Sequence, residues 1–127
     1  MRYTPENITS LKLNEIFVFG SNESGSHGGG AAKQAMKWGA KWGKPEGLFG
    51  KTYAIPTKTF HAGKTLSLSK IGEYVNSFIS YATAHPEYTF LVTKIGCGLA
   101  GLTVEEVAPL FKDAIGIENI ILPKEFH

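Results

Sequence analysis

The chain has 127 residues, of which 43% are hydrophobic and 19% are charged. This length fits one domain over residues 1–127, large enough to bury a hydrophobic core without disulfides. The formal net charge of +2 is small and the basic residues are scattered, which argues against a dedicated nucleic-acid-binding protein. A single cysteine excludes a disulfide within the chain, and the four histidines lack metal-ligand spacing. We therefore expect neither a bound metal nor another cofactor.

No stretch of the sequence approaches the about 20 apolar residues that a membrane-spanning helix needs. The first residues also lack the apolar core of a signal peptide. We therefore expect a cytoplasmic protein that does not contact a membrane and that is a monomer or a weakly associating homo-oligomer.

Short apolar runs alternate along the chain with segments of helical period. Ile8–Leu13 is a candidate edge strand, and Ile16–Phe19, which stops at Gly20, is typical of a buried strand. Alanines and tryptophans at positions 31, 35, 38 and 42 recur at helical spacing and predict a helix, which Lys44–Gly47 ends.

The same alternation continues through the second half of the chain. Pro86 ends a long apolar stripe of helical period, and Thr103 with Glu106 has the spacing of a capping box that opens a helix. The predicted elements are a strand at 52–55, a helix at 68–85, a strand at 90–92, a helix from 103 to 116 and a strand at 120–122.

This order predicts an α/β fold, in which strands that alternate with helices form a mostly parallel sheet between helical layers. Ligands of such sheets bind beyond the carboxyl ends of the strands. Two glycine-rich loops, at 25–32 and 96–101, each follow a strand. We therefore expect both loops to lie at the same edge of the sheet.

The first loop has four glycines within Gly25–Gly30 and runs directly into the predicted helix. Glycines let a backbone approach a ligand closely, and a helix start favours an anion. The loop is therefore predicted to hold a diphosphate or a ribose; the alternative is a flexible connector whose glycines serve only a tight turn.

The second loop, Ile95–Gly101, lies between a strand and the capped helix and offers more unobstructed amides for an anion. No Gly-Lys-Ser/Thr follows either loop, so neither is a Walker A loop.

The sequence around these loops resembles the macro domain family. The start of that family typically reads Gly-Asp-Ile-Thr, a short strand, Asn-Ala-Ala-Asn and a glycine run. This chain is similar at Glu6–Thr9, at Ile16–Asn22 and at the triple glycine before an alanine-rich helix. Ala54–Lys58 and Thr93–Leu99 resemble the terminal ADP-ribose glycohydrolases and the DNA ADP-ribosyl glycohydrolase antitoxins of the same branch. The resemblance covers roughly residues 6–123 and implies a compact, macro-domain-like three-layer α/β/α fold with an ADP-ribose cleft.

The resemblance also implies roles for single residues. Asn7 falls where the family has the aspartate that contacts adenine, and Asn22 falls on an asparagine that contacts the distal ribose. Gly28–Gly30 fall on the distal-ribose loop and Gly96–Gly101 on the diphosphate loop. Lys58 falls on the catalytic lysine, and a lysine near a sugar anomeric carbon can attack C1″ or polarise the leaving group; the alternative is a solvated lysine or one that only neutralises phosphate.

One departure from the family concerns catalysis. The terminal-ribose enzymes carry an aspartate directly after Gly-Cys-Gly-Leu, where this chain has Ala100. The DNA-directed enzymes resemble this chain in having a small residue there. Lys58 and Asn22 are the predicted catalytic residues. The predicted ligand-binding residues are Asn7, Ile8, Ser21, Asn22, His27, Gly28, Gly29, Gly30, Ala31, Thr57, Ile95, Gly96, Cys97, Gly98, Leu99, Ala100 and Gly101.

Several side chains near the loops allow two interpretations. His27 is a candidate acid or base, or an exposed residue that caps the loop. Cys97 is interpreted as a small residue that fits the phosphate loop, with a nucleophile as the alternative. Tyr53, Phe49 and Phe60 are candidates for an adenine-stacking wall, or for the core.

The leading functional hypothesis is a domain that binds ADP-ribose and hydrolyses the ADP-ribosyl linkage to a protein or a nucleobase, so that nucleic acid would be a partner only as modified substrate. The alternatives are a binding module without catalysis, a phosphatase acting on ADP-ribose 1″-phosphate, and a nucleic-acid-binding domain that uses the lysines of 33–44. The small net charge argues against the last alternative.

Overall fold

The computed structural model describes residues 2–61 and 63–127. It contains a five-stranded sheet with the order β2-β3-β1-β4-β5. The strands are β1 (Glu15–Asn22), β2 (Gly47–Phe49), β3 (Thr52–Lys58), β4 (Thr89–Val92) and β5 (Ile120–Ile121). All neighbouring strands are parallel except β2 and β3, which form an antiparallel pair.

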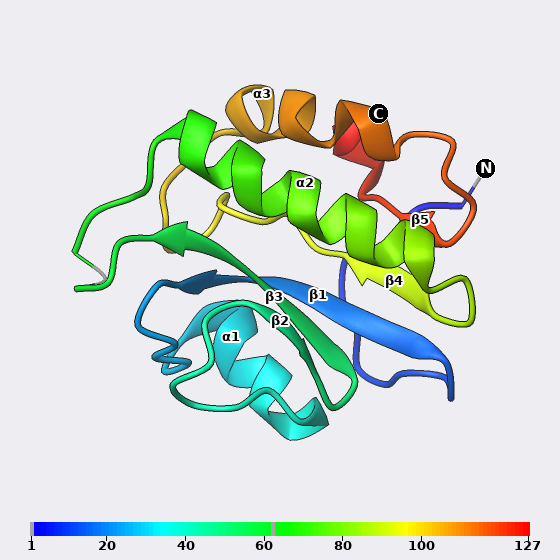
Figure 1. Ribbon diagram of the computed structural model, residues 1–127, viewed down its shortest axis with the longest axis horizontal. Helices are drawn as coiled ribbons and strands as arrows, with labels where there is room; N and C mark the ends of the chain where they lie inside the picture. The colour runs from blue at the N-terminus through cyan, green and yellow to red at the C-terminus, as the bar shows by residue number, and fades with distance from the viewer. Residues whose placement is uncertain (1, 62) are drawn as a thin grey trace.

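Helices cover both faces of this sheet (Figure 1). One face carries α2 (Leu68–Ala84), α3 (Val104–Val107) and the 3-10 segments η2 (Ala108–Ala114) and η3 (Lys124–Phe126). The other face carries α1 (Gly30–Ala35), which continues into the 3-10 turn η1 (Met36–Trp38). The predicted three-layer α/β/α fold with a mostly parallel mixed sheet is therefore confirmed.

Alternation along β1 separates two hydrophobic clusters, because successive side chains of a strand point to opposite faces. Ile16 and Val18 pack on the α2 side, whereas Phe17 and Phe19 pack on the α1 side. The stripe of α2 is buried as the sequence predicts, and the Ser67 side chain caps the start of this helix by accepting a hydrogen bond from the amide of Lys70.

Several predicted boundaries are wrong. The helix expected at 31–42 ends after η1, and Ile8–Leu13 is not an edge strand but an irregular segment over the α1 side of the sheet. The helix expected from 103 consists of one α turn followed by 3-10 structure, in which Pro109 removes a backbone donor. The edge strand β2 was not predicted; it is only three residues long. No helix in the described part of the chain has the length and apolar character needed to cross a bilayer.

Candidate functional site

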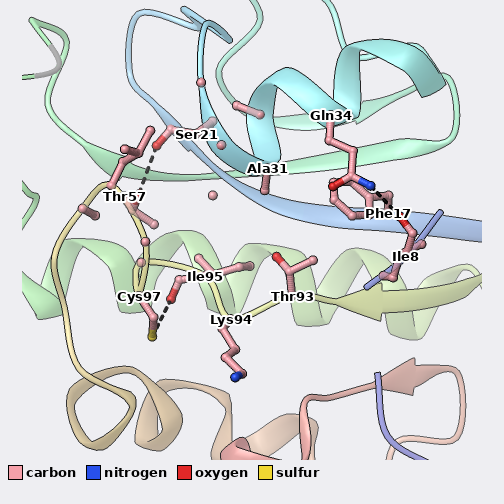
Figure 2. A pocket seen from close by; sticks show the side chains of 18 of the residues that line it. Ile8, Phe17, Ser21, Ala31, Gln34, Thr57, Thr93, Lys94, Ile95 and Cys97 are labelled. Carbon is pink, nitrogen blue, oxygen red and sulfur yellow. Dashed lines mark hydrogen bonds between the residues drawn. The ribbon is translucent and has the colours of Figure 1, made fainter. Parts of the chain in front are cut away.

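A cavity of about 1030 Å³ lies along the carboxyl-terminal half of β1, between the two glycine-rich loops (Figure 2). Most of the predicted site residues line it. They are Asn7, Ile8, Ser21, Asn22, Gly28, Gly29, Gly30, Ala31, Thr57, Lys58, Ile95, Gly96, Cys97, Gly98, Leu99 and Ala100. The topology brings them together because β1, β3 and β4 are parallel and end at the same edge of the sheet.

The segment Thr93–Ala100 forms one wall of the cavity and follows β1 along its length. At one end the Thr93 amide and hydroxyl both donate to the Val18 carbonyl, with N–O and O–O distances of 3.1 and 2.8 Å. At the other end the Thr65 hydroxyl donates to the Ala100 carbonyl, with an O–O distance of 2.5 Å. The wall thus reaches from the middle of β1 to the segment that pairs with the end of β3.

This wall presents backbone donors to the cavity. The amides of Gly96, Gly98, Leu99 and Ala100 have no acceptor among the described residues, whereas Cys97 donates back to Lys94. Gly96 is buried with φ +80°, a conformation that non-glycine residues rarely adopt. A group of free amides in a turn is a natural binding site for an anion.

The α3 helix contributes little to this donor set. Its N-terminus is closed by a capping box, in which the Thr103 side chain accepts from the Glu106 amide and the Glu106 side chain accepts from the Thr103 amide. The free donors of this wall therefore belong to the loop itself and not to the start of a helix.

The opposite wall is the loop from Asn22 to Gly30. The amide of the Asn22 side chain is committed within this loop: it donates to the Ser26 carbonyl at 3.0 Å and accepts from the Ser26 amide at 2.9 Å. Asn22 therefore shapes the loop as well as lining the cavity. The backbone amides of Gly28, Gly29 and Gly30 have no acceptor among the described residues. The helix α1 that follows them is only six residues long, so its dipole is weaker than that of the longer helix predicted from the sequence.

The two walls approach each other at the exposed rim. A Cβ added to Gly29 would lie 3.3 Å from Leu99 Cδ1, and one added to Gly28 would lie 3.8 Å from the Trp42 ring. Leu99 and Trp42 remain 72% and 61% exposed. The glycines thus leave room for these two apolar side chains at the mouth of the cavity.

His27 and Gly101, two of the predicted ligand-binding residues, are not among the residues that line the cavity. The His27 ring is 2% exposed and packs edge-on against Phe19 and Trp42 behind the glycine loop. Its Nε2 lies 3.3 Å from the Lys44 carbonyl, and its Nδ1 is buried without a partner. His27 therefore supports the loop from behind and is not the exposed cap that the sequence also allowed. Gly101 lies past the turn, and its amide donates to Gly98.

Lys58 occupies the end of the cavity where β1 and β3 stop. It pairs in register with Asn22 after a shift at the end of β1. Its neighbour Thr57 is buried and donates to the Ser21 carbonyl at 3.2 Å, a bond drawn in Figure 2. No carboxylate of the described residues forms an ion pair with Lys58. This arrangement leaves a half-buried cation beside the space that a ligand would fill.

The opposite end of the cavity carries charges that sequence reasoning missed. The Lys94 ammonium lies 3.1 Å from a carboxylate oxygen of Glu6 and 3.1 Å from one of Glu125. All three residues line the cavity. They come from both ends of the chain and from the β4–α3 loop, so no local motif could have indicated the cluster.

The predicted aromatic wall is not at the site. Tyr53 is a core residue in contact with Phe78, and burial is the main reason that its pKa is raised to about 12. Phe49 and Phe60 do not line the cavity, whereas Phe17 and Trp42 do. The aromatic side chains of the lining therefore come from β1 and from the turn after η1.

The Cys97 thiol lines the cavity, and burial is the main cause of its raised pKa. A thiol that holds its proton more tightly is a weaker nucleophile at neutral pH, which supports the interpretation of Cys97 as a small packing residue. Within residues 2–61 and 63–127, no three His, Cys, Asp or Glu side chains gather as they would around a metal ion.

Comparison with solved structures identifies the architecture. A protein of unknown function from Bacteroides thetaiotaomicron matches with a TM-score of 0.62 and 15% identity over 91% of this chain and 88% of that one. A macrodomain protein from Streptomyces coelicolor matches with a TM-score of 0.58 and 17% identity over 91% of this chain and 90% of that one. The chain has a macrodomain-like fold. The likeness at this identity extends to the fold alone, and the macrodomain-like sheet places both glycine-rich loops over its carboxyl edge.

No family model and no curated protein matches the sequence. The macrodomain-like architecture of this chain is therefore recognised through its structure and through the short motifs at the cavity.

Proposed function

We propose that the cavity binds ADP-ribose or an ADP-ribosyl group. The observation that carries this proposal is the set of free amides at Gly96, Gly98, Leu99 and Ala100, whose residues line the cavity. Backbone amides fixed in a loop bind a diphosphate without paying for reorganisation when the ligand arrives.

The length of the cavity supports a ligand of this size. Its lining includes Phe17, the third residue of β1, and Asn22, the last. The five residue steps between them span about 16 Å at the rise of an extended strand. A diphosphate held in the middle would leave room for a nucleoside toward Phe17 and Ile8, and for a second ribose toward Asn22 and Lys58.

We further propose that the chain hydrolyses the bond between C1″ of the distal ribose and its acceptor. Lys58 is the reacting residue in this proposal, because it is a cation without an ion-pair partner among the described residues at the end assigned to the distal ribose. Either its amine attacks C1″ while the acceptor leaves with a proton, or its ammonium donates that proton while water attacks C1″. In both routes one water is consumed overall, with its hydroxyl on C1″ and its proton on the acceptor.

A binding module without catalysis is the second candidate, and Ala100 favours it. The Ala100 carbonyl accepts from the Thr65 hydroxyl, and Thr65 bridges Lys58. Ala100 therefore lies at the same end of the cavity as Lys58, but its methyl group cannot move a proton. Binding would then depend on the loops alone.

Calorimetry with ADP-ribose tests the binding proposal, and absence of heat together with absence of a thermal shift at millimolar ligand would contradict it. Release of ADP-ribose from modified protein and from modified DNA tests hydrolysis. We expect Lys58→Ala to lower release at least about 100-fold, which corresponds to about 2.7 kcal/mol in the barrier, while Lys112→Ala, on η2, leaves it unchanged. If the wild type and Lys58→Ala release ADP-ribose equally fast, Lys58 has no catalytic role. If the wild type binds ADP-ribose but releases none from modified substrates, the hydrolysis proposal fails and the chain is a binding module.

Two further measurements refine the outcome. Treatment with borohydride during turnover reduces an imine between the lysine amine and C1″, so a trapped adduct on Lys58 distinguishes attack by the amine from proton donation. Phosphate released from ADP-ribose 1″-phosphate would instead indicate a phosphatase.

A further inference from the structure

We propose that the cluster of Glu6, Lys94 and Glu125, hereafter the acidic clasp, determines ligand specificity by rejecting ligands that carry an additional phosphate on the ribose next to the nucleobase. The clasp would favour instead a ribose with free hydroxyl groups. This inference rests on the proposed binding of an ADP-ribose-type ligand.

The clasp is a connected set of charges at the wall of the cavity. Lys94 lies between two carboxylates at 3.1 Å each, and the three side chains are 35%, 73% and 37% exposed in the order Lys94, Glu6, Glu125. In Figure 2 the Lys94 side chain extends away from α1, toward the side of the C-terminal segment. One ammonium against two carboxylates leaves a net charge of −1 at this place.

The position of the clasp along the cavity follows from the hydrogen bonds of the wall. Thr93, directly before Lys94, is bonded to Val18, whereas Ala100 is bonded to Thr65. Thr65 forms a bridge with Lys58. Lys94 therefore lies at the end of the wall opposite Lys58, and the free amides from Gly96 to Ala100 lie between them.

The charged residues of the lining divide between these two ends. Among the described lining residues the charged ones are Glu6, Lys58, Lys94 and Glu125. The Lys58 end carries +1 and the clasp end carries −1. A ligand whose diphosphate lies on the amides and whose reacting ribose lies at Lys58 thus places its nucleoside beside the clasp.

The ammonium of the clasp is already engaged. The hydrogen bonds that Lys94 donates to Glu125 and then to Glu6 are the main causes that raise the pKa of Lys94. A backbone hydrogen bond and then the hydrogen bond from Lys94 lower the pKa of Glu125. The Glu125 carboxylate thus stays charged at neutral pH, and the Lys94 ammonium is held between it and Glu6. Exposed ion pairs of this kind add little to stability, so the inference depends on their field and not on any contribution to folding.

Hydroxyl and phosphate groups respond oppositely to this field. A ribose hydroxyl can donate a hydrogen bond to a carboxylate oxygen of Glu6 or Glu125, a charge-assisted bond. A phosphate offers only hydrogen-bond acceptors, so it cannot donate to these carboxylates, and the net negative charge of the clasp repels it. The Lys94 ammonium could neutralise the phosphate only by breaking its ion pairs with Glu6 and Glu125. The clasp is therefore a filter for the nucleoside end of the ligand.

The test compares the affinities of ADP-ribose and ADP-ribose 2′-phosphate by calorimetry, for three proteins. The wild type is compared with the double variant Glu6→Gln/Glu125→Gln, which keeps the shape of the clasp and frees Lys94. The control is Glu73→Gln/Glu118→Gln, two exposed glutamates outside the lining, which changes the net charge of the chain by the same amount.

We expect the wild type and the control to bind ADP-ribose at least about tenfold more tightly than the 2′-phosphate in dilute buffer, and about 0.5 M salt to reduce this ratio through screening. In the Gln double variant the ratio falls to within about threefold, because Lys94 is free to pair with the phosphate. Equal affinities in the wild type, or an unchanged ratio in the Gln double variant, overturn the inference while the proposed binding stands. If the wild type does not bind ADP-ribose, the proposed function fails, and the inference fails with it.

Discussion

The hydroxyl of Thr65 donates a hydrogen bond to the carbonyl of Ala100, and this bond joins the two halves of the site. Thr65 also forms a β-bridge with Lys58, and the Leu66 amide donates to Thr57 at 2.8 Å. The backbone of Thr65 is thus joined to the strand that carries Lys58, and its side chain is bonded to the loop whose amides would hold a diphosphate.

This link predicts that Thr65 positions Lys58. We expect Thr65→Val, which keeps the shape and removes the hydroxyl, to lower kcat for ADP-ribose release about fivefold, or about 1 kcal/mol, with little change in Kd for ADP-ribose. Thr65→Ser restores the hydroxyl and should restore kcat. If both variants lose stability equally and share one rate, Thr65 acts only through folding.

Ala100 offers a gain-of-function test. Because the Ala100 carbonyl accepts from Thr65, which bridges Lys58, Ala100→Asp would supply a proton-transfer group at the Lys58 end of the cavity. General acid–base catalysis contributes about 10²-fold or more to a rate. We expect the rate of ADP-ribose release in a single turnover to rise at least about tenfold in this variant. In Ala100→Asn the side chain has the size of aspartate but no carboxylate, so the rate of release should stay at the wild-type value. An Asp variant that binds ADP-ribose but reacts no faster than the Asn variant contradicts the prediction.

The second loop contains a matched pair of glycines. A Cβ on Gly96, at φ +80°, would lie 3.1 Å from Leu102 Cδ1, whereas one on Gly98 would meet nothing within 4 Å. We expect Gly96→Ala to reduce the free energy of unfolding by roughly 1–2 kcal/mol through its left-handed backbone and to weaken ADP-ribose binding. Gly98→Ala should leave stability within about 0.5 kcal/mol. Urea denaturation and calorimetry measure both effects, and equal stabilities of the two variants would contradict this assignment.

The hydrogen bond of Tyr74 on α2 leads us to expect that the protein loses stability in strong base. Its hydroxyl donates to a Glu23 carboxylate oxygen at 2.7 Å, and this bond is the main reason that its pKa is raised from 10.0 to about 12. A raised pKa means that the folded state keeps a proton that the unfolded state releases, so the stabilisation is complete below pH 10.0 and is lost as the pH rises to about 12.

We expect Tyr74→Phe and Glu23→Gln each to flatten the fall in stability over this pH range, measured by urea denaturation at a series of pH values. A wild-type slope that is retained in both variants would show that the hydrogen bond does not cause the shift.

The sequence indicated the elements that depend on local pattern. The apolar runs of β1, β3 and β4 and the stripe of α2 lie where periodicity places them, because burial of one face is encoded in the spacing of neighbouring residues. The glycine-rich loops follow strands for the same reason, and parallel strands bring both to one edge of the sheet.

Distant contacts decided where the first helix ends. A helix at 31–42 satisfies the local spacing, yet Gly39 adopts φ +105° and a Cβ there would lie 2.9 Å from Gly50 Cα. The Lys51 amide donates to the Trp38 carbonyl at 2.8 Å. The close passage of the chain before β3 thus ends the helix and turns Trp42 toward the cavity, which no local pattern contains.

The sequence by itself determined the two loops, the strands before them and the position of Lys58, since these depend on residue types and spacing within one segment. Only the tertiary structure decided that His27 lies behind its loop and that the Asn22 side chain is hydrogen-bonded to the Ser26 backbone. The ion pairs of Lys94 with Glu6 and Glu125 likewise arise only in the folded chain. Such contacts join residues as far apart as Glu6 and Lys94, which are 88 positions apart, and their energies depend on distances that arise only once the sheet has formed.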